Sequence, residues 1–350
     1  TRRQRQMCIR DRLMQCSTTE RDAMSSSKPP LWVWALLVAA VFGVSSAGTL
    51  LQQIDLDPLL KASWRLQLTA VVLFPFAIVQ WRQQPEDVKA KMFERRTLGI
   101  LSLSGVALAL HFGAWVASLK YTTLTHSLLF VTAHPLIVVG GMFMLGFFAI
   151  GVRQPTKREL YGALIGFTGA ALTLLDEGTQ QGDNTVTFLG DSLALLGALT
   201  VVGYIVCGRI LRSWMPIFLY AFPVTLLGAV LLLPASWLVE NDFATYGVFG
   251  WIDPTFFGWF LALALIAGLL GHTGLNTCLK YLSPLVISAC VTLEPVIGSL
   301  IGYAVFGTNL PGRWTWLGGG VLMVGLLLIV TAIPNIEDTK NQTSPAIEAS

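Results

Sequence analysis

The sequence has 350 residues, of which 54% are hydrophobic and 12% are charged, and its mean hydropathy is +0.64. An ordinary soluble domain is about 25% charged, so this composition excludes a large soluble domain and predicts a polytopic membrane protein. Residues 1–23 hold six of the basic and three of the acidic residues, so they account for the whole net charge of +3. The charge therefore gives no evidence of a nucleic-acid partner.

The chain opens with the run "RRQRQMCIRDR" at 2–12. This run resembles the translation of a sequencing adapter, so we leave it out of the fold and place the native start at Met14 or Met24. The alternative is a basic cytosolic arm. In either case we expect residues 1–30 and the tail 334–350 to be disordered, because neither has apolar periodicity.

Ten apolar stretches follow, and each is close to the roughly 20 residues that a membrane-spanning helix needs. They lie at 31–51, 58–80, 97–118, 124–146, 159–176, 188–208, 215–238, 255–278, 283–306 and 314–333. Short polar connections such as "RQQPED" and "TNLPG" separate them. None of these connections is long enough to form a further domain.

The charges of the connections predict the orientation of the spans. The connections after the second and fourth spans are basic, with Arg82, Lys89, Lys91, Arg95 and Arg96 in one and Arg153, Lys157 and Arg158 in the other. The connections 177–187 and 240–253 contain no Lys or Arg. Basic loops stay in the cytosol, so we expect both termini there, in either the plasma membrane or an organelle membrane.

The chain also repeats itself. "SLKYTTLTHSLLFVTAHPLIV" at 118–138 aligns without gaps to "CLKYLSPLVISACVTLEPVIG" at 278–298. Five spans is an odd number, so the second half must enter the membrane from the opposite side. The sequence thus predicts an all-α membrane protein with ten transmembrane helices in two inverted five-helix repeats, 31–176 and 188–333, joined by an outer loop at 177–187. Inverted repeats are typical of transporters, whose site lies near the midplane between the halves.

Each repeat carries an ionisable residue followed by a proline at the same depth: His134-Pro135 in one and Glu294-Pro295 in the other. Proline breaks a helix from within, and ionisable residues inside a membrane usually face a cavity and mark function. We therefore expect Glu294 and His134 to bind substrate or couple ions beside two helix breaks. The alternatives are prolines kept for packing, a protonated structural Glu294 and a His134 bonded to a neighbouring carbonyl.

Four further residues are candidates for a substrate site. Arg65 lies in the second span and could hold an anion, or its stem could extend to the outer headgroups. His111 and Trp115 are four residues apart, on one face of the third span. Asn276 aligns with Val116 across the repeat. The alternative for His111 and Trp115 is ordinary hydrogen bonding between helices.

At these residues the sequence resembles the EamA-like transporters of the drug/metabolite transporter superfamily. The resemblance covers about residues 31–333, and its most specific part is "LKYLSPLVISACVTLEPVIGSLIGYAVFG". It implies transport or export of small organic solutes by alternating access. The family often has a glutamate after the glycine that closes the ninth helix, whereas here Thr308 follows Gly307. That departure weakens any inference of a substrate from the family.

The residues show no motif of a membrane enzyme, no metal-ligand spacing and no cofactor site. The predicted function is therefore a secondary transporter of a small organic metabolite, with proton coupling through Glu294 as a further hypothesis. The alternative is a receptor or scaffold that keeps the fold without transporting. The expected partners are a small solute and the lipid bilayer, without nucleic acid; whether the protein forms a homodimer stays open, as do the solute and the direction of transport.

Overall fold

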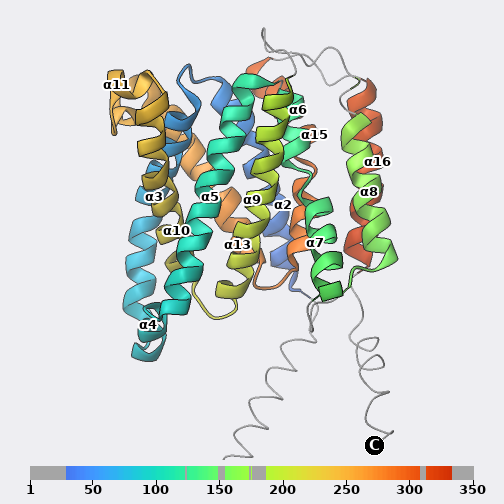
Figure 1. Cartoon of the computed structure of the whole chain (residues 1–350), viewed down its shortest axis with the longest axis horizontal. Helices are drawn as coiled ribbons and strands as arrows, with labels where there is room; N and C mark the ends of the chain where they lie inside the picture. The colour runs from blue at the N-terminus through green and yellow to red at the C-terminus, as the bar shows by residue number, and fades with distance from the viewer. Residues whose placement is uncertain are drawn as a thin grey trace, which may run out of the picture. The chain divides into compact units, whose positions relative to one another are not determined.

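The computed structural model describes residues 29–122, 124–148, 154–172, 175, 187–307 and 313–332. Within these ranges all regular secondary structure is helical (Figure 1). Residues 177–186 of the predicted outer loop lie outside the described residues, as do residues 1–28 and 334–350 of the two tails, for which we predicted disorder.

The helices follow the predicted spans closely. Their bounds are α2 (Leu31–Gln52), α3 (Pro58–Gln83), α5 (Arg95–Tyr121), α6 (Leu124–Val131), α7 (His134–Phe148), α8 (Lys157–Leu172), α9 (Phe188–Arg212), α10 (Ile217–Val239), α12 (Pro254–Ala262), η4 (Leu263–Thr273), α13 (Gly274–Cys278), α14 (Pro284–Val291), α15 (Glu294–Phe306) and α16 (Arg313–Thr331). The segments α12, η4 and α13 follow one another without a gap, and η4 is a π-helical stretch.

Eight of the predicted spans are, in the described part of the chain, long and apolar enough to cross a membrane. The fifth span corresponds to α8, which has 16 residues, and the tenth to α16, whose apolar stretch covers Trp316–Ile329. The molecule is thus an all-helical, multi-pass membrane protein. The total of ten crossings remains a prediction.

Two connections that were predicted as loops contain short helices. The segment after α3 forms α4 (Glu86–Met92), and the segment after α10 forms α11 (Asp242–Tyr246) and the 3-10 turn η3 (Gly250–Ile252). The charges of α4 explain its formation, since acidic residues occupy its first turn and basic residues its last turn. That order complements the helix dipole.

Helices α3 and α10, which are equivalent in the two repeats, pack against each other in opposite directions. At the start of α3, the amide of Leu59 donates to Glu240 Oε1 just after the end of α10, at 2.6 Å. At the other end, the amide of Phe218 donates to Gln80 Oε1, at 2.9 Å. In Figure 1, α3 accordingly leads down to α4 while α10 leads up to α11. Equivalent helices of opposite direction are what an inverted repeat requires.

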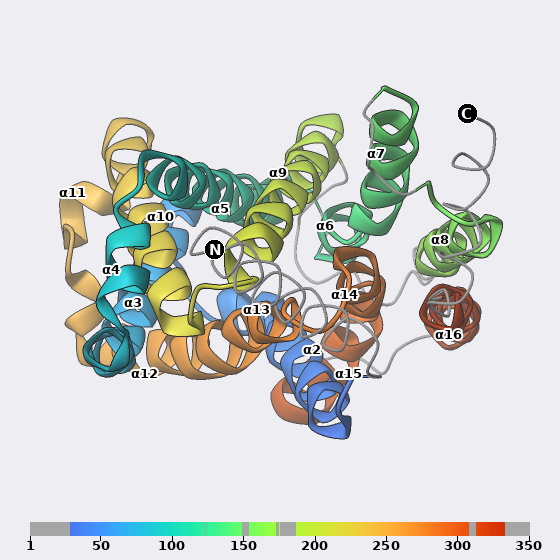
Figure 2. The same ribbon diagram turned by 90° about the horizontal axis from the view of Figure 1, so that it is seen from below.

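Further pairs of packed helices join the two repeats. Helix α5 packs on α9, and α7 contacts α14. Helices α8 and α16 lie side by side in both views (Figures 1 and 2). Large apolar side chains such as Phe42, Phe74 and Trp237 are exposed on the outside of the bundle, as lipid contact requires.

Candidate functional site

The fourth and ninth spans are both interrupted, at equivalent positions. Helix α6 ends at Val131 and α7 begins at His134, while α14 ends at Val291 and α15 begins at Glu294. In each case the proline follows directly, at the second residue of the new helix, where its missing N–H leaves no hydrogen bond unmade. Each break therefore places an ionisable side chain at the start of a helix in the middle of a span.

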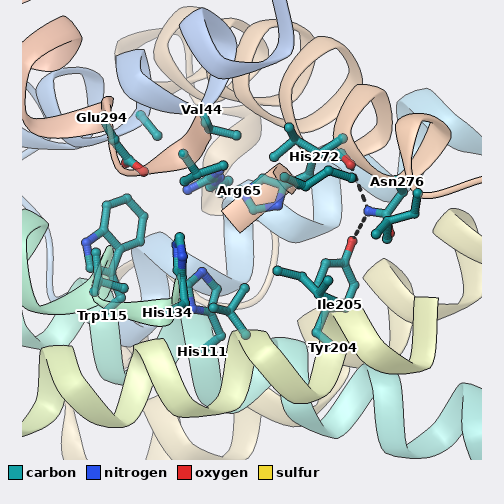
Figure 3. Close-up of a pocket in the computed structure, with 17 residues that line it drawn as sticks. Val44, Arg65, His111, Trp115, His134, Tyr204, Ile205, His272, Asn276 and Glu294 are labelled. Atoms are coloured by element: carbon teal, nitrogen blue, oxygen red, sulfur yellow. Dashed lines mark hydrogen bonds between the residues drawn. The ribbon is translucent and has the colours of Figure 1, made fainter. Parts of the chain in front are cut away.

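A cavity of about 640 Å³, counting the open space at its mouth, lies between the repeats. Its wall includes residues from α2, α3, α5, α6 and α7 of the first repeat and from α9, η4, α13, α14 and α15 of the second. All six side chains that the sequence singled out for binding or coupling line it (Figure 3), namely Arg65, His111, Trp115, His134, Asn276 and Glu294. Arg65 and Glu294, which are 229 positions apart in the chain, thus face the same cavity.

Arg65 is the most deeply buried charged residue of this site, with 1% of its surface exposed. Its Cζ atom lies 4.3 Å from the centre of the Phe112 ring and 5.8 Å from that of Trp115. Stacking of this kind holds the guanidinium plane in place. The terminal nitrogens Nη1 and Nη2 have no hydrogen-bond partner among protein atoms. The alternative of a stem that extends to the outer headgroups is inconsistent with this arrangement.

Glu294 faces the same cavity and is 7% exposed. Figure 3 shows its carboxyl group near the Arg65 guanidinium, toward one end of the cavity. Among the residues that the structure describes, the direct ion pairs are Lys89–Glu86 and Lys120–Asp57, so Arg65 and Glu294 are not in ion-pair contact. Arg65 and Glu294 are therefore neighbours whose charged groups are not in contact. A ligand could bind between these groups, or the two side chains could move closer together.

The histidines of the wall differ in their partners. His111 Nδ1 lies 2.9 Å from the carbonyl oxygen of Gly197 in α9, so His111 makes the interhelical hydrogen bond that was the alternative to a binding role. Its ring also stacks on Trp115, with the ring centres 6.2 Å apart. His134 Nδ1 and Trp115 Nε1 are buried without a partner among protein atoms.

Asn276, the Tyr204 hydroxyl and the backbone carbonyl of His272 form a polar cluster at the other end of the cavity (Figure 3). The His272 ring lies nearer Arg65, with its centre 5.1 Å from that of the Phe112 ring. Asn276 Nδ2 donates to the Tyr204 hydroxyl and, at 2.7 Å, to the His272 carbonyl oxygen. Asn276 Oδ1 is left without a partner among protein atoms. In the described part of the chain, no three His, Cys, Asp or Glu residues are grouped to hold a metal ion.

Two polar residues of the wall, His272 and Tyr204, were not predicted from the sequence. His272 is an ionisable residue inside an apolar span, the same signal that identified His134, and it could have been found in that way. Tyr204 offers no comparable signal, because tyrosines in membrane helices are common at the interfaces.

Comparison with known proteins gives the family. The profile of the EamA-like transporter family matches residues 31–175 and, a second time, residues 188–331. The chain belongs to the EamA-like transporter family. The two matches coincide with the two repeats of this EamA-like protein, so the family resemblance and the repeat are both confirmed.

Solved structures agree on the fold. One that is described only as "Crystal structure of protein" has a TM-score of 0.65 and 16% sequence identity, over 87% of this chain and 98% of the other. At this identity the likeness shows the fold alone. No curated protein matches the sequence of this EamA-like protein.

Proposed function

We infer that this EamA-like protein is a secondary transporter that moves a small organic solute by alternating access. Ten membrane crossings with both termini in the cytosol complete the architecture. The two inverted repeats rock about the shared cavity and open it to one side of the membrane at a time. Transport is coupled to protons through Glu294, and the protein is not an enzyme.

The position of Glu294 carries this proposal. A carboxyl group in an apolar, narrow cavity is costly to ionise, so its protonation changes when the cavity opens to water. The helix break places this group where both repeats meet. A receptor or scaffold that only kept the fold would gain no stability from a buried carboxyl group, which favours transport over that alternative.

The test compares cells that carry an empty vector, the wild-type chain, Glu294→Gln or Glu294→Ala. Untargeted mass spectrometry of cells and medium, with and without an imposed pH gradient, identifies the solutes whose distribution the wild-type chain changes. Glu294→Gln keeps the size of the side chain but fixes it as neutral, so we expect it to lose gradient-driven movement while it retains exchange. Glu294→Ala should lose both.

Glu94→Gln is the matched control, because Glu94 is an exposed carboxyl group at the start of α5. It should behave like the wild-type chain. If Glu294→Gln retains full gradient-driven transport, the proposed proton coupling is wrong. If no solute is distributed differently between cells with the wild-type chain and cells with the empty vector, the proposed transport function is wrong and the scaffold alternative is favoured.

A further inference from the structure

The wall around Arg65 offers hydrogen-bond donors that no protein group uses. Arg65 contributes Nη1 and Nη2, and Trp115, which stacks beside it, contributes Nε1. All three atoms are buried, and a buried charged donor without an acceptor costs more than a neutral one. A ligand that supplies two acceptor oxygens to a guanidinium fork removes this cost.

The charged residues that line the cavity limit the charge that a ligand bound there can carry. Of the described residues that line the cavity, Arg65 carries the permanent positive charge and Glu294 is the acid. The other titratable side chains facing the cavity are His111, His134, Tyr204 and His272. One permanent cation neutralises a monoanion but leaves a dianion with an unpaired charge in a low-dielectric site. A cationic ligand would be repelled by Arg65.

The rest of the cavity wall is apolar, and this indicates the chemistry of the rest of the ligand. Apart from its polar residues, the wall consists mainly of aliphatic side chains, among them Val44, Val201, Ile205, Leu275, Ile287 and Val291. Transfer of an apolar group from water to such a surface is favourable.

We propose that the solute is an organic monocarboxylate with a small apolar body, and that its carboxylate and the carboxylate of Glu294 take turns as the partner of Arg65. This inference rests on the proposed transport function and adds the substrate class to it. Arg65 binds the solute in one state. In the other state Glu294 moves closer to Arg65 than in this structure, where the two side chains are not in ion-pair contact, and pairs with it.

Competition between the solute carboxylate and Glu294 for Arg65 couples solute transport to proton transport. When Glu294 takes up a proton from the open side, its carboxyl becomes neutral, Arg65 is released and the monoanion binds. When the solute leaves on the other side, Glu294 gives its proton to water and its carboxylate returns to Arg65. The net charge of Arg65, Glu294 and solute is zero in both states. One proton therefore moves with one anion in the same direction, and the cycle is electroneutral.

The experiment measures binding to the detergent-solubilised full chain by calorimetry, with three probes of one shape and different charge: benzoate, benzamide and benzylamine. At about pH 6, where benzoate is an anion, we expect the wild-type chain to bind benzoate and to bind the other two at least about tenfold more weakly. Binding of benzoate should weaken as the pH rises from about 6 to about 8, because a larger fraction of the Glu294 side chains is ionised at higher pH and an ionised carboxylate competes with benzoate for Arg65. Arg65→Gln should lose at least about tenfold in benzoate affinity, and Arg65→Lys should restore part of it.

Glu294→Gln provides the test that does not depend on the folding of an Arg65 variant. Without a competing carboxylate it should bind benzoate equally well at both pH values, while Glu94→Gln should keep the pH dependence of the wild-type chain. Failure of benzoate to bind, equal binding of benzamide or benzylamine, or a pH dependence that survives in Glu294→Gln would each overturn the proposal. The metabolite comparison above does not depend on the charge of the solute, so transport can stand when this inference fails.

Discussion

Gly162 of α8 and Gly325 of α16 lie directly against one another. A Cβ atom built on Gly162 would come within 2.8 Å of the Gly325 carbonyl oxygen, and one built on Gly325 within 2.6 Å of the Gly162 carbonyl oxygen. A Cβ on Gly169 would likewise come within 2.6 Å of the Gly318 carbonyl oxygen. In the repeat, Gly162 aligns with Gly318 and Gly169 with Gly325, each 156 positions later in the chain. The two contacts are therefore images of each other, as a two-fold relation between the repeats requires.

This close approach predicts the effect of adding one methyl group. Gly325→Ala should lower the free energy of unfolding by about 1–3 kcal/mol, because backbone atoms of α8 cannot move aside as a flexible side chain could. Gly320→Ala on the same helix is the control, since nothing lies within 4 Å of a Cβ there. Alanine is the better helix former by about 1 kcal/mol, so the control should be neutral or slightly stabilised.

The measurement is the thermal midpoint of the detergent-solubilised protein, followed by size-exclusion chromatography after heating. Equal midpoints for Gly325→Ala and Gly320→Ala would contradict the packing of α8 on α16.

Glu240 caps the start of α3 from the other repeat. Its two carboxylate oxygens accept hydrogen bonds from the amides of Leu59, at 2.6 Å, and Leu60, at 2.9 Å, and the Ser236 hydroxyl donates to it at 2.6 Å. The first amides of a helix have no partner within the helix, and a carboxylate there also interacts favourably with the helix dipole. Glu240→Ala should therefore cost about 1–2 kcal/mol of stability.

Glu94→Ala is a suitable comparison for Glu240→Ala. Glu94 precedes α5 in the same way that a capping residue would, but its side chain makes no capping hydrogen bond. Chemical unfolding of both variants should show a loss for Glu240→Ala and little change for Glu94→Ala. A similar loss in both would mean that general charge, and not the bonds to Leu59 and Leu60, explains the effect.

The spans and the repeat could be predicted from the sequence because both depend on local information. Apolar length places each helix, and the alignment of His134-Pro135 with Glu294-Pro295 relates the halves. The presence of an ionisable residue inside an apolar run also marks the charged and imidazole side chains of the cavity wall, since burial of such a residue needs a polar environment.

The partners of these residues could not be predicted in the same way. Whether Arg65 extends outward or stacks on Phe112 depends on the packing of α3 against α5. No local pattern in the sequence indicates how these two helices pack. The hydroxyl of Tyr204 meets Asn276 only because α9 and α13 are neighbours in space. The helix α11 was missed because five residues are too few for a periodic pattern.

The charges of the connections predict the orientation of the chain in its membrane. The helix α4 and the start of α5 belong to a basic connection, and α11 belongs to a connection without Lys or Arg. Basic segments are retained in the cytosol during insertion. We therefore expect the end of the bundle that carries α4 to face the cytosol and the end that carries α11 to face the opposite side.

Two single cysteines test this orientation: Thr245→Cys in α11 and Glu94→Cys next to α4, both at exposed positions. In intact cells with the protein at the surface, an impermeant maleimide should label Thr245→Cys, and Glu94→Cys should react only after the membrane is permeabilised. Of the five cysteines, Cys207, Cys278 and Cys290 are buried, and Cys8 and Cys16 lie outside the described residues. The wild-type chain, carried in parallel, sets the background from all five. Labelling of Glu94→Cys in intact cells together with protection of Thr245→Cys would reverse the orientation. It would leave the inverted repeat intact, because a reversed bundle keeps α3 and α10 antiparallel.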